Sequence, residues 1–168
     1  MKQGFEIERK FIIKKPDISL LEKMSDKIIN ITQAYIGQNS DGFNCRVRKS
    51  KQNGQAQFFY TEKKNVNQIT RIENECLIDE TTFNMLFEKR LENRNVIEKT
   101  RYVVNKNGFC YEIDIFPFWQ NQAFMEVELE DESVNIPPIE NIEILEDVTF
   151  KKGYSNFALS NKIPQEIV

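Results

Sequence analysis

Histidine does not occur in the 168-residue sequence, and the three cysteines are widely separated. Without an imidazole, the protein has neither serine–histidine nor cysteine–histidine nucleophilic catalysis, nor a histidine general base. Cys45, Cys76 and Cys110 show no CxxC spacing, so we interpret them as small hydrophobic residues rather than disulfide or zinc-site residues. Any chemistry must therefore use carboxylates, amines, guanidiniums and metal ions.

Long apolar runs are also missing, and no segment has the length of a signal peptide or a membrane span. We therefore expect a cytoplasmic protein with no membrane partner. No linker rich in proline, glycine or serine divides the chain, so we expect one domain over residues 1–168. The net charge is only −3, with both signs spread along the chain, which indicates no DNA-binding surface.

Most of the sequence is typical of β-strands. Asn53-Gly54 and Asn107-Gly108 are dipeptides that suit type I′ hairpin turns, and Asp41-Gly42 is a third candidate turn. About eight strands are predicted around these turns, over residues 4–13, 32–38, 42–50, 55–64, 69–78, 96–104, 109–116 and 123–130.

Three helices interrupt or follow the strands. The first is expected over residues 19–28, where Ser19 and Glu22 form a candidate capping box. The second, over 79–91, has Asp79 as its candidate N-cap, and a short third helix is expected over 154–160. Their apolar stripes are interpreted as faces that pack on the core.

Charge alternates with apolar residues along the strands. In the segment FEIERKFII, Glu6, Glu8 and Lys10 share one face of a strand, while Ile7 and Phe11 share the other. The same alternation gives further charged sets: Arg46 and Arg48; Glu73 and Glu75; Lys99 and Arg101; Glu112 and Asp114; Glu126, Glu128 and Glu130. The pattern predicts a sheet with one charged face and one apolar face.

Two interpretations of the charged face are open. A half-buried antiparallel sheet normally turns a polar face to water, and each strand alone fits that interpretation. The pairs carry the same sign, however, and like charges side by side repel one another. About eight strands can also close into a barrel, which would place the charges in its lumen. Such an interior would cost several kcal/mol per unpaired ion unless a ligand neutralised it.

The residue types indicate which ligand that would be. Paired carboxylates without imidazole or thiolate partners suit a hard cation, Mg²⁺ or Mn²⁺. The charged faces also carry more lysines and arginines than a ligand with one carboxylate would need, namely Lys10, Arg46, Arg48, Lys63, Lys99 and Arg101. Arginine binds phosphate oxygens in bidentate fashion. Together these residues describe a site for a polyphosphate. Because no glycine-rich phosphate loop is present, side chains would hold the phosphates.

The sequence resembles the CYTH domain, the family of triphosphate tunnel metalloenzymes. Glu6-Ile7-Glu8-Arg9-Lys10 is similar to the ExExK signature of the family. The resemblance continues in order through CRVRKS, FFYTEKK, TRIENECLI, VIEKTRYVV, YEIDIF, FMEVELE and DVTFKKGYSNFALS. The last segment departs from the family pattern, since Lys151 stands where an acidic residue is common and Gly153 where a basic one usually precedes the tyrosine.

The resemblance implies an α+β fold: a closed, eight-stranded antiparallel β-barrel, or tunnel, with a charged lumen and a few helices packed outside. It implies that Glu6, Glu8, Glu126 and Glu128 hold one or two metal ions, supported by Glu112 and Asp114, and that these glutamates and Lys10 act in catalysis. The residues implied to grip the triphosphate are Lys10, Arg46, Arg48, Lys63, Lys99 and Arg101, with Glu73 and Glu75 orienting them or helping to place water.

The activity implied by the resemblance is metal-dependent hydrolysis of a triphosphate, and the start EIERKF favours inorganic tripolyphosphate. Thiamine triphosphatase and class IV adenylate cyclase activities are the alternatives within the family. A cyclase would need an adenine pocket and a group that activates the ribose 3′ hydroxyl, and we identify neither. An aromatic residue at the mouth of the tunnel could stack on an organic group; the candidates are Tyr35, Phe43, Tyr60, Phe109 and Trp119, although packing explains each of them as well.

Two interpretations without catalysis stay open. The tunnel could capture polyphosphate, a nucleotide or the 5′ triphosphate end of RNA, or the barrel could be structural, with a solvated charged face. A homodimer is compatible with the family, and the sequence does not decide the oligomeric state.

Overall fold

The computed structural model describes residues 1–168, apart from the side chain of Lys2. These residues form nine strands: β1 (Lys2–Lys14), β2 (Lys27–Gln38), β3 (Asn44–Gln52), β4 (Gln55–Asn65), β5 (Thr70–Ile78), β6 (Ile97–Lys106), β7 (Phe109–Ile115), β8 (Gln122–Leu129) and β9 (Ile144–Asp147). The helices are α1 (Ile18–Met24), α2 (Glu80–Glu88) and α3 (Asn156–Leu159), with a 3₁₀ turn η1 (Lys152–Tyr154). No helix in the described chain is long and apolar enough to cross a membrane.

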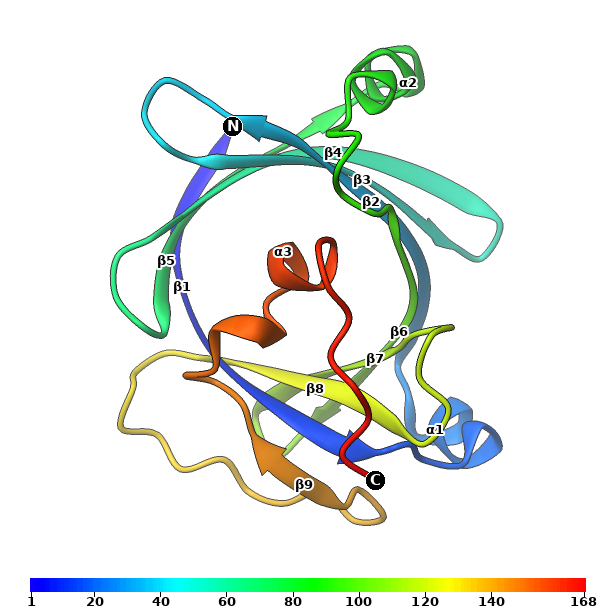
Figure 1. The fold of residues 1–168 in the computed structure, drawn as a ribbon. Coiled ribbons are helices and arrows are strands. Elements are labelled where there is room, and N and C mark those ends of the chain that lie inside the picture. Colours follow the sequence, from blue (N-terminus) through cyan, green and yellow to red (C-terminus); the bar gives the residue numbers. More distant parts are fainter.

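Strands β1 to β8 close into an antiparallel barrel, which Figure 1 shows as a ring. The neighbours run β5-β4-β3-β2-β6-β7-β8-β1, and a further pairing between β1 and β5 closes the ring. Closure depends on the length of β1, because residues 2–7 pair with β5 and residues 7–14 pair with β8. The predicted α+β fold with an eight-stranded antiparallel barrel is therefore confirmed.

The predicted turns also form. Asn53 and Gly54 have φ of 50° and 78°, and Asn107 and Gly108 have φ of 54° and 79°, as type I′ turns require. At the third candidate turn only Gly42 has positive φ, and the loop extends from Asn39 to Phe43. The ninth strand, β9, was not predicted; it pairs with residues 11–13 of β1.

The predicted start of the first helix is wrong. Asp17 is the N-cap, because its carboxylate accepts a hydrogen bond from the backbone N–H of Leu20 at 2.9 Å, and Ser19 lies within the first turn. The helix ends at Met24, and β2 begins at Lys27, inside the range predicted as helix. Asp79 is the N-cap of α2, as predicted, and accepts from the N–H of Thr82 at 2.7 Å.

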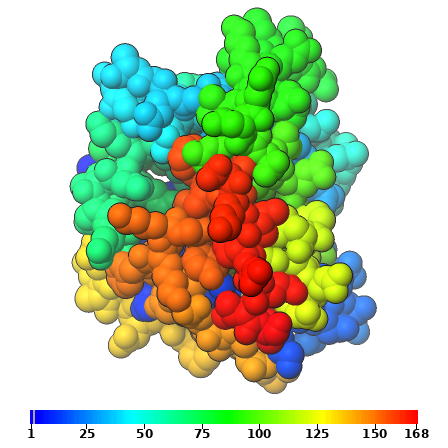
Figure 2. All heavy atoms as spheres, in the orientation of Figure 1, coloured from blue at the N-terminus to red at the C-terminus, as the bar shows by residue number. Residues whose placement is uncertain are grey.

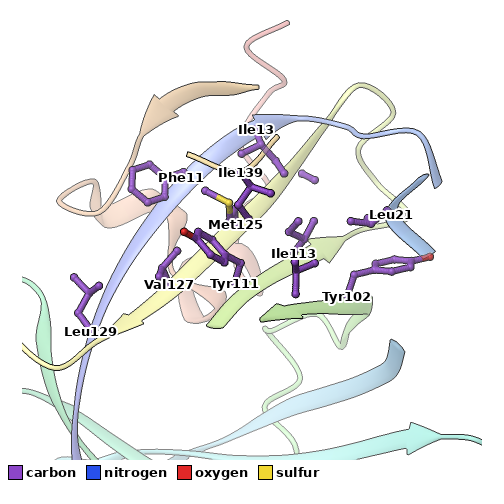
Figure 3. Packing of buried hydrophobic residues seen from close by; sticks show 12 residues of the cluster. Phe11, Ile13, Leu21, Tyr102, Tyr111, Ile113, Met125, Val127, Leu129 and Ile139 are labelled. Carbon is purple, nitrogen blue, oxygen red and sulfur yellow. The ribbon is translucent and has the colours of Figure 1, made fainter. Parts of the chain in front are cut away.

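The apolar faces of the strands are covered from outside the barrel. Phe11, Met125 and Val127 belong to a core on the outer face of β1, β7 and β8, over which Leu21 of α1 packs (Figure 3). On the opposite side, Phe83 of α2 packs on Val47 and its neighbours. Full burial of such a side chain contributes about 1.5–3 kcal/mol, so these contacts account for much of the stability of the barrel wall.

A second apolar core fills one end of the barrel from within. Ile12, Phe124 and Ile97 lie on the same strand faces as Lys10, Glu126 and Lys99, yet they pack with one another, Trp119 and Leu159. The lumen is thus charged in its middle and apolar at this end.

The C-terminal segment, residues 148–168, lies across the same end of the barrel (Figures 1 and 2). Its backbone carbonyls accept hydrogen bonds from the barrel and its loops: the N–H of Asn95 donates to the carbonyl of Ser160 at 2.6 Å, and the Trp119 side chain donates through Nε1 to the carbonyl of Pro164 at 3.1 Å. Helices α1 and α2 pack outside the barrel, as expected, whereas α3 lies over its end and borders the interior cavity.

Candidate functional site

A cavity of about 280 Å³ occupies the middle of the barrel and extends to α3. Most of the residues predicted as site residues line it: Glu6, Glu8, Arg46, Arg48, Lys63, Glu73, Lys99, Arg101, Glu112, Glu126 and Glu128. Lys10, Glu75 and Asp114 do not line the cavity but contact residues that do. The alternation along the strands therefore brings charges that are distant in the sequence into one interior space.

Carboxylates collect where β1 meets β8. Glu8 and Glu128 are direct partners in the strand register, and like charges in that position destabilise a sheet. Glu8 is bound by Arg71, and Glu6 by Lys63 at 2.8 Å, whereas Glu128 forms no ion pair with any side chain that the structure describes. Burial and the charges of Glu6, Glu73 and Glu8 raise the pKa of Glu128. This side of the cavity can accept a cation.

Arg101 is the centre of a buried ion network. Its Nε lies 2.7 Å from Asp114 Oδ1, its Nη2 lies 3.1 Å from Glu126 Oε2, and its Nη1 contacts Glu112. Burial opposes ionisation of Asp114, but the charges of Arg101 and Lys99 hold the pKa of Asp114 below its ordinary value. Burial raises the pKa of Glu112, which is the most exposed of the three carboxylates. These carboxylates thus converge on a guanidinium.

Two lysines lie directly on the apolar core at the end of the barrel. Lys99 Nζ is 2.5 Å from Asp114 Oδ2 and 5.7 Å from the centre of the Phe116 ring. Burial, and then the charge of Arg101, lowers the pKa of Lys99 to about 8. Lys10 Nζ is 2.6 Å from Glu126 Oε1 and donates to the carbonyl of Tyr154 at 3.1 Å. Positive charge is therefore held where little water can solvate it.

Arg46 and Arg48 form the part of the site with surplus positive charge. Arg46 is 6 % exposed and forms no ion pair with any carboxylate that the structure describes, and its Nε has no hydrogen-bond partner. Arg48 Nη2 lies 3.1 Å from Glu75 Oε2, but its Nε is also without a partner. Burial, and then the charge of Arg46, lowers the pKa of Arg48 to about 10. Two adjacent guanidiniums that repel each other, one buried and one half-buried, can accept an anion.

Glu73 and Glu75 hold the cations of this wall in position. Glu73 Oε2 lies 2.5 Å from Lys63 Nζ, and the charge of Lys63 outweighs burial and lowers the pKa of Glu73. Glu75 accepts hydrogen bonds from Arg48 at 3.1 Å and from the Thr61 hydroxyl at 2.8 Å. Both carboxylates are engaged by side chains of the cavity wall.

Several residues of the cavity were not predicted from the sequence. Arg71 shares the face of Glu73 and Glu75, so the alternation used for the other strands would have identified it. Gln33 of β2 is uncharged and carries no such signal. Asn156 and Phe157 reach the cavity only because the C-terminal segment crosses the end of the barrel, which no local pattern indicates.

Of the five aromatic candidates for the mouth of the tunnel, Tyr35 alone borders this cavity, where its ring meets that of Phe157 at 5.0 Å. Trp119 belongs to the apolar core at the end of the barrel, and Tyr60 and Phe109 pack with the two outer cores. All three cysteines are free, and Cys45 is buried. In the divergent C-terminal segment, Lys151 is bound to Glu146.

Comparison with known proteins identifies the family. Residues 4–152 match the model of the CYTH domain. The solved structure of the inorganic triphosphatase NE1496 is 32% identical to this chain, with a TM-score of 0.59, over 95% of this chain and 97% of that one. No curated protein matches the sequence.

Two further solved structures share the fold. PH1819 from Pyrococcus horikoshii is 18% identical with a TM-score of 0.57, and a conserved hypothetical protein from Pyrococcus furiosus is 20% identical with a TM-score of 0.56; each match covers 76% of this chain and 80% of the other. The family model spans most of the sequence, and every motif that suggested the resemblance lies on a barrel strand or in the C-terminal segment. The chain belongs to the CYTH family.

Proposed function

We propose that the protein is a metal-dependent triphosphatase that hydrolyses inorganic tripolyphosphate to pyrophosphate and phosphate. The observation that carries this proposal is the adjacent pair of guanidiniums, Arg46 and Arg48, which line the interior cavity and whose buried Nε groups lack acceptors. An unpaired buried cation is costly, and a polyanionic substrate would relieve that cost. The likeness to an inorganic triphosphatase supports the same reaction class.

The cations would act by position and charge. In phosphoryl transfer, negative charge is spread over the phosphate oxygens and the leaving group, and fixed positive groups stabilise it without reorganising. Arg46, Arg48 and Lys99 would bind the phosphates, while Glu75 keeps the Arg48 guanidinium in place. The apolar core beneath Lys99 keeps water away from that side, which strengthens each of these interactions.

The carboxylate side fits a divalent cation. Glu6, Glu8 and Glu128 would hold it, with support from Glu126, since oxygen ligands suit Mg²⁺ and Mn²⁺, and the pKa of Glu128 is raised by partial burial and by the charges of Glu6, Glu73 and Glu8. No three of these side chains, among those that the structure describes, already meet in the arrangement of a metal site. When bound, the metal would supply positive charge beside the phosphates and lower the pKa of a water molecule.

The lining of the cavity favours an inorganic substrate. Pockets for organic ligands are lined mostly by apolar and aromatic side chains, whereas this cavity of about 280 Å³ is lined mainly by charged ones. Thiamine triphosphate or ATP would have to place its organic group outside it. A second cavity of about 480 Å³ adjoins Arg48 and Arg101 at the other end of the barrel, so both compounds belong in the test.

The test is phosphate release from tripolyphosphate, thiamine triphosphate and ATP in parallel, with Mg²⁺, with Mn²⁺ and with EDTA. We expect turnover of tripolyphosphate that needs the metal, rises toward alkaline pH and is lost in Glu8→Gln and Arg48→Ala. The matched control is Lys51→Ala, which removes an exposed charge from the same strand as Arg48. Activity that persists in excess EDTA would contradict the proposal, and binding without any turnover would favour a capture module.

A further inference from the structure

Gln33 is an uncharged polar residue in the charged part of the lumen. Its side chain is 1 % exposed, and its Nε2 has no hydrogen-bond partner among the side chains that the structure describes. A buried N–H group without an acceptor costs about 1–3 kcal/mol. The cost of burying Gln33 inside the barrel must therefore be offset, either by a ligand that accepts from its N–H group or by the packing of its side chain.

The position of Gln33 in the sheet indicates what the ligand is. Gln33 lies on the same side of β2 as Tyr35, borders the interior cavity and is the direct register partner of Arg48 on β3. Side chains in such pairs have Cβ atoms about 5 Å apart. The next residue on that face of β3 is Arg46. Three N–H donors of neighbouring residues that line the same cavity therefore lack acceptors: Gln33 Nε2, Arg46 Nε and Arg48 Nε.

We infer that Gln33 is a substrate-binding residue, whose Nε2 donates a hydrogen bond to a phosphate oxygen held between Arg46 and Arg48. One tetrahedral anion has enough acceptor oxygens to satisfy all three donors. The inference rests on the proposed function in that it takes a polyphosphate as the ligand, and it assigns a residue to which neither the charge pattern nor the family motifs pointed.

A neutral donor is suited to this position. A third cation beside Arg46 and Arg48 would add to a repulsion that already lowers the pKa of Arg48. A carboxylate would form an ion pair with Arg48 and repel the phosphate. An amide adds a hydrogen bond without changing the charge, so it orients the phosphate and leaves the electrostatics of the wall unchanged.

The experiment measures the affinity of the protein for tripolyphosphate by calorimetry in EDTA, which blocks the proposed turnover, and for pyrophosphate in Mg²⁺. We expect Gln33→Leu to bind tripolyphosphate about ten- to a hundredfold more weakly than the wild type, and Gln33→Glu to bind it more weakly still. Gln3→Leu is the control, because Gln3 is exposed on the outer side of β1. Circular dichroism and thermal unfolding establish that each variant is folded.

The outcomes separate this inference from the proposed function. If the wild type binds, Gln33→Leu loses affinity and no triphosphate is hydrolysed, Gln33 is a binding residue and the proposed enzyme is wrong. If Gln33→Leu binds as well as the wild type and unfolds at a higher temperature, Gln33 is a packing residue and the inference is overturned, whatever the activity. A wild type that binds neither anion would overturn it too.

Discussion

The cavity contains two kinds of buried arginine. Arg101 is surrounded by carboxylates, which offset the cost of burying its charge, whereas Arg46 has no carboxylate partner that the structure describes. The first arrangement is a structural network in which each member depends on the others. The second is costly in the free protein, and we propose that a bound anion offsets this cost. The two residues should therefore respond in opposite ways to replacement.

Arg101→Met should destabilise the protein by about 3–5 kcal/mol at pH 7, because Asp114 and Glu126 would be left buried without their shared cation. The measurement is the free energy of unfolding in urea. Lys106→Met on the same strand removes an exposed charge and should change it by less than about 0.5 kcal/mol. An Arg101→Met protein as stable as the wild type would show that the network does not contribute to folding.

The same network predicts a pH dependence. The pKa values of Asp114 and Glu126 are lower in the folded protein than the unfolded values of about 3.9 and 4.3, since burial is outweighed by neighbouring cations. The unfolded state therefore binds more protons, and stability is lost as the pH falls below about 4. In Arg101→Met the two carboxylates lose a cation, so the destabilisation relative to the wild type should shrink between pH 7 and pH 4. A difference independent of pH would contradict this.

How far the site could be predicted depends on the residue type. Same-sign pairs at alternate positions, such as Glu6 with Glu8 and Arg46 with Arg48, are visible in the sequence and converge in the structure. The sequence does not show which side chains face one another across neighbouring strands, because this depends on the register between the strands. Asp114 faces a guanidinium, that of Arg101, whereas Glu8 faces another carboxylate, that of Glu128. Uncharged residues such as Gln33 give no periodic charge signal at all.

At the level of elements, the strands were predicted more reliably than the segment that closes the barrel. Alternation and Asn-Gly turns are local features, so the eight barrel strands could be recognised individually. The path of residues 148–168 is set by contacts with distant parts of the chain, such as Asn95 and Trp119. The face that carries Lys10 and Glu126 also turns apolar at Ile12 and Phe124, where that segment covers it.

Arg94 should control how tightly α3 is held over the cavity. Its Nη1 donates to the carbonyl of Phe157 at 2.8 Å, and its guanidinium lies 3.9 Å from the centre of the Phe157 ring. A hydrogen bond to a charged group contributes about 1.5–3 kcal/mol, so Arg94→Ala should speed amide exchange at Leu159 and Ser160 roughly ten- to a hundredfold.

Arg90→Ala is the matched control for this change, because Arg90 contacts only the end of α2, at Phe87. The rates of amide hydrogen exchange in the barrel strands should be the same in both variants as in the wild type. Equal exchange at Leu159 in Arg94→Ala and the wild type would show that other contacts hold α3.

At the level of the whole molecule, the barrel balances opposite charges across one interior space. Carboxylates face the cavity mainly from β1 and β8, and two adjacent guanidiniums, Arg46 and Arg48, face it from β3, whereas Arg71 of β5 and Arg101 of β6 are paired with carboxylates. We propose that this arrangement separates a place for a cation from a place for phosphates, with the closed ring of strands keeping the two at a fixed distance. The apolar core at one end of the barrel and the outer cores on its wall stabilise the fold and offset the free-energy cost of the charged interior.

Ligand binding should therefore stabilise the whole fold. At a tripolyphosphate concentration of 100 times the dissociation constant, the free energy of unfolding should rise by about 2.7 kcal/mol, because only the folded barrel assembles the cationic wall. Urea unfolding with and without tripolyphosphate checks this, and inorganic sulfate at equal ionic strength controls for salt effects. Equal effects of the two salts would indicate general screening rather than a site.

The measurement that tests the central claim most directly is the thermal unfolding of wild type and Arg46→Met, each with and without tripolyphosphate. The claim is that Arg46 binds an anion and does not stabilise the fold of the free protein. It predicts that the free variant unfolds at the same temperature as the wild type or higher, and that most of the stabilisation by tripolyphosphate is lost. A free variant that unfolds at a lower temperature, with the stabilisation undiminished, would contradict the account.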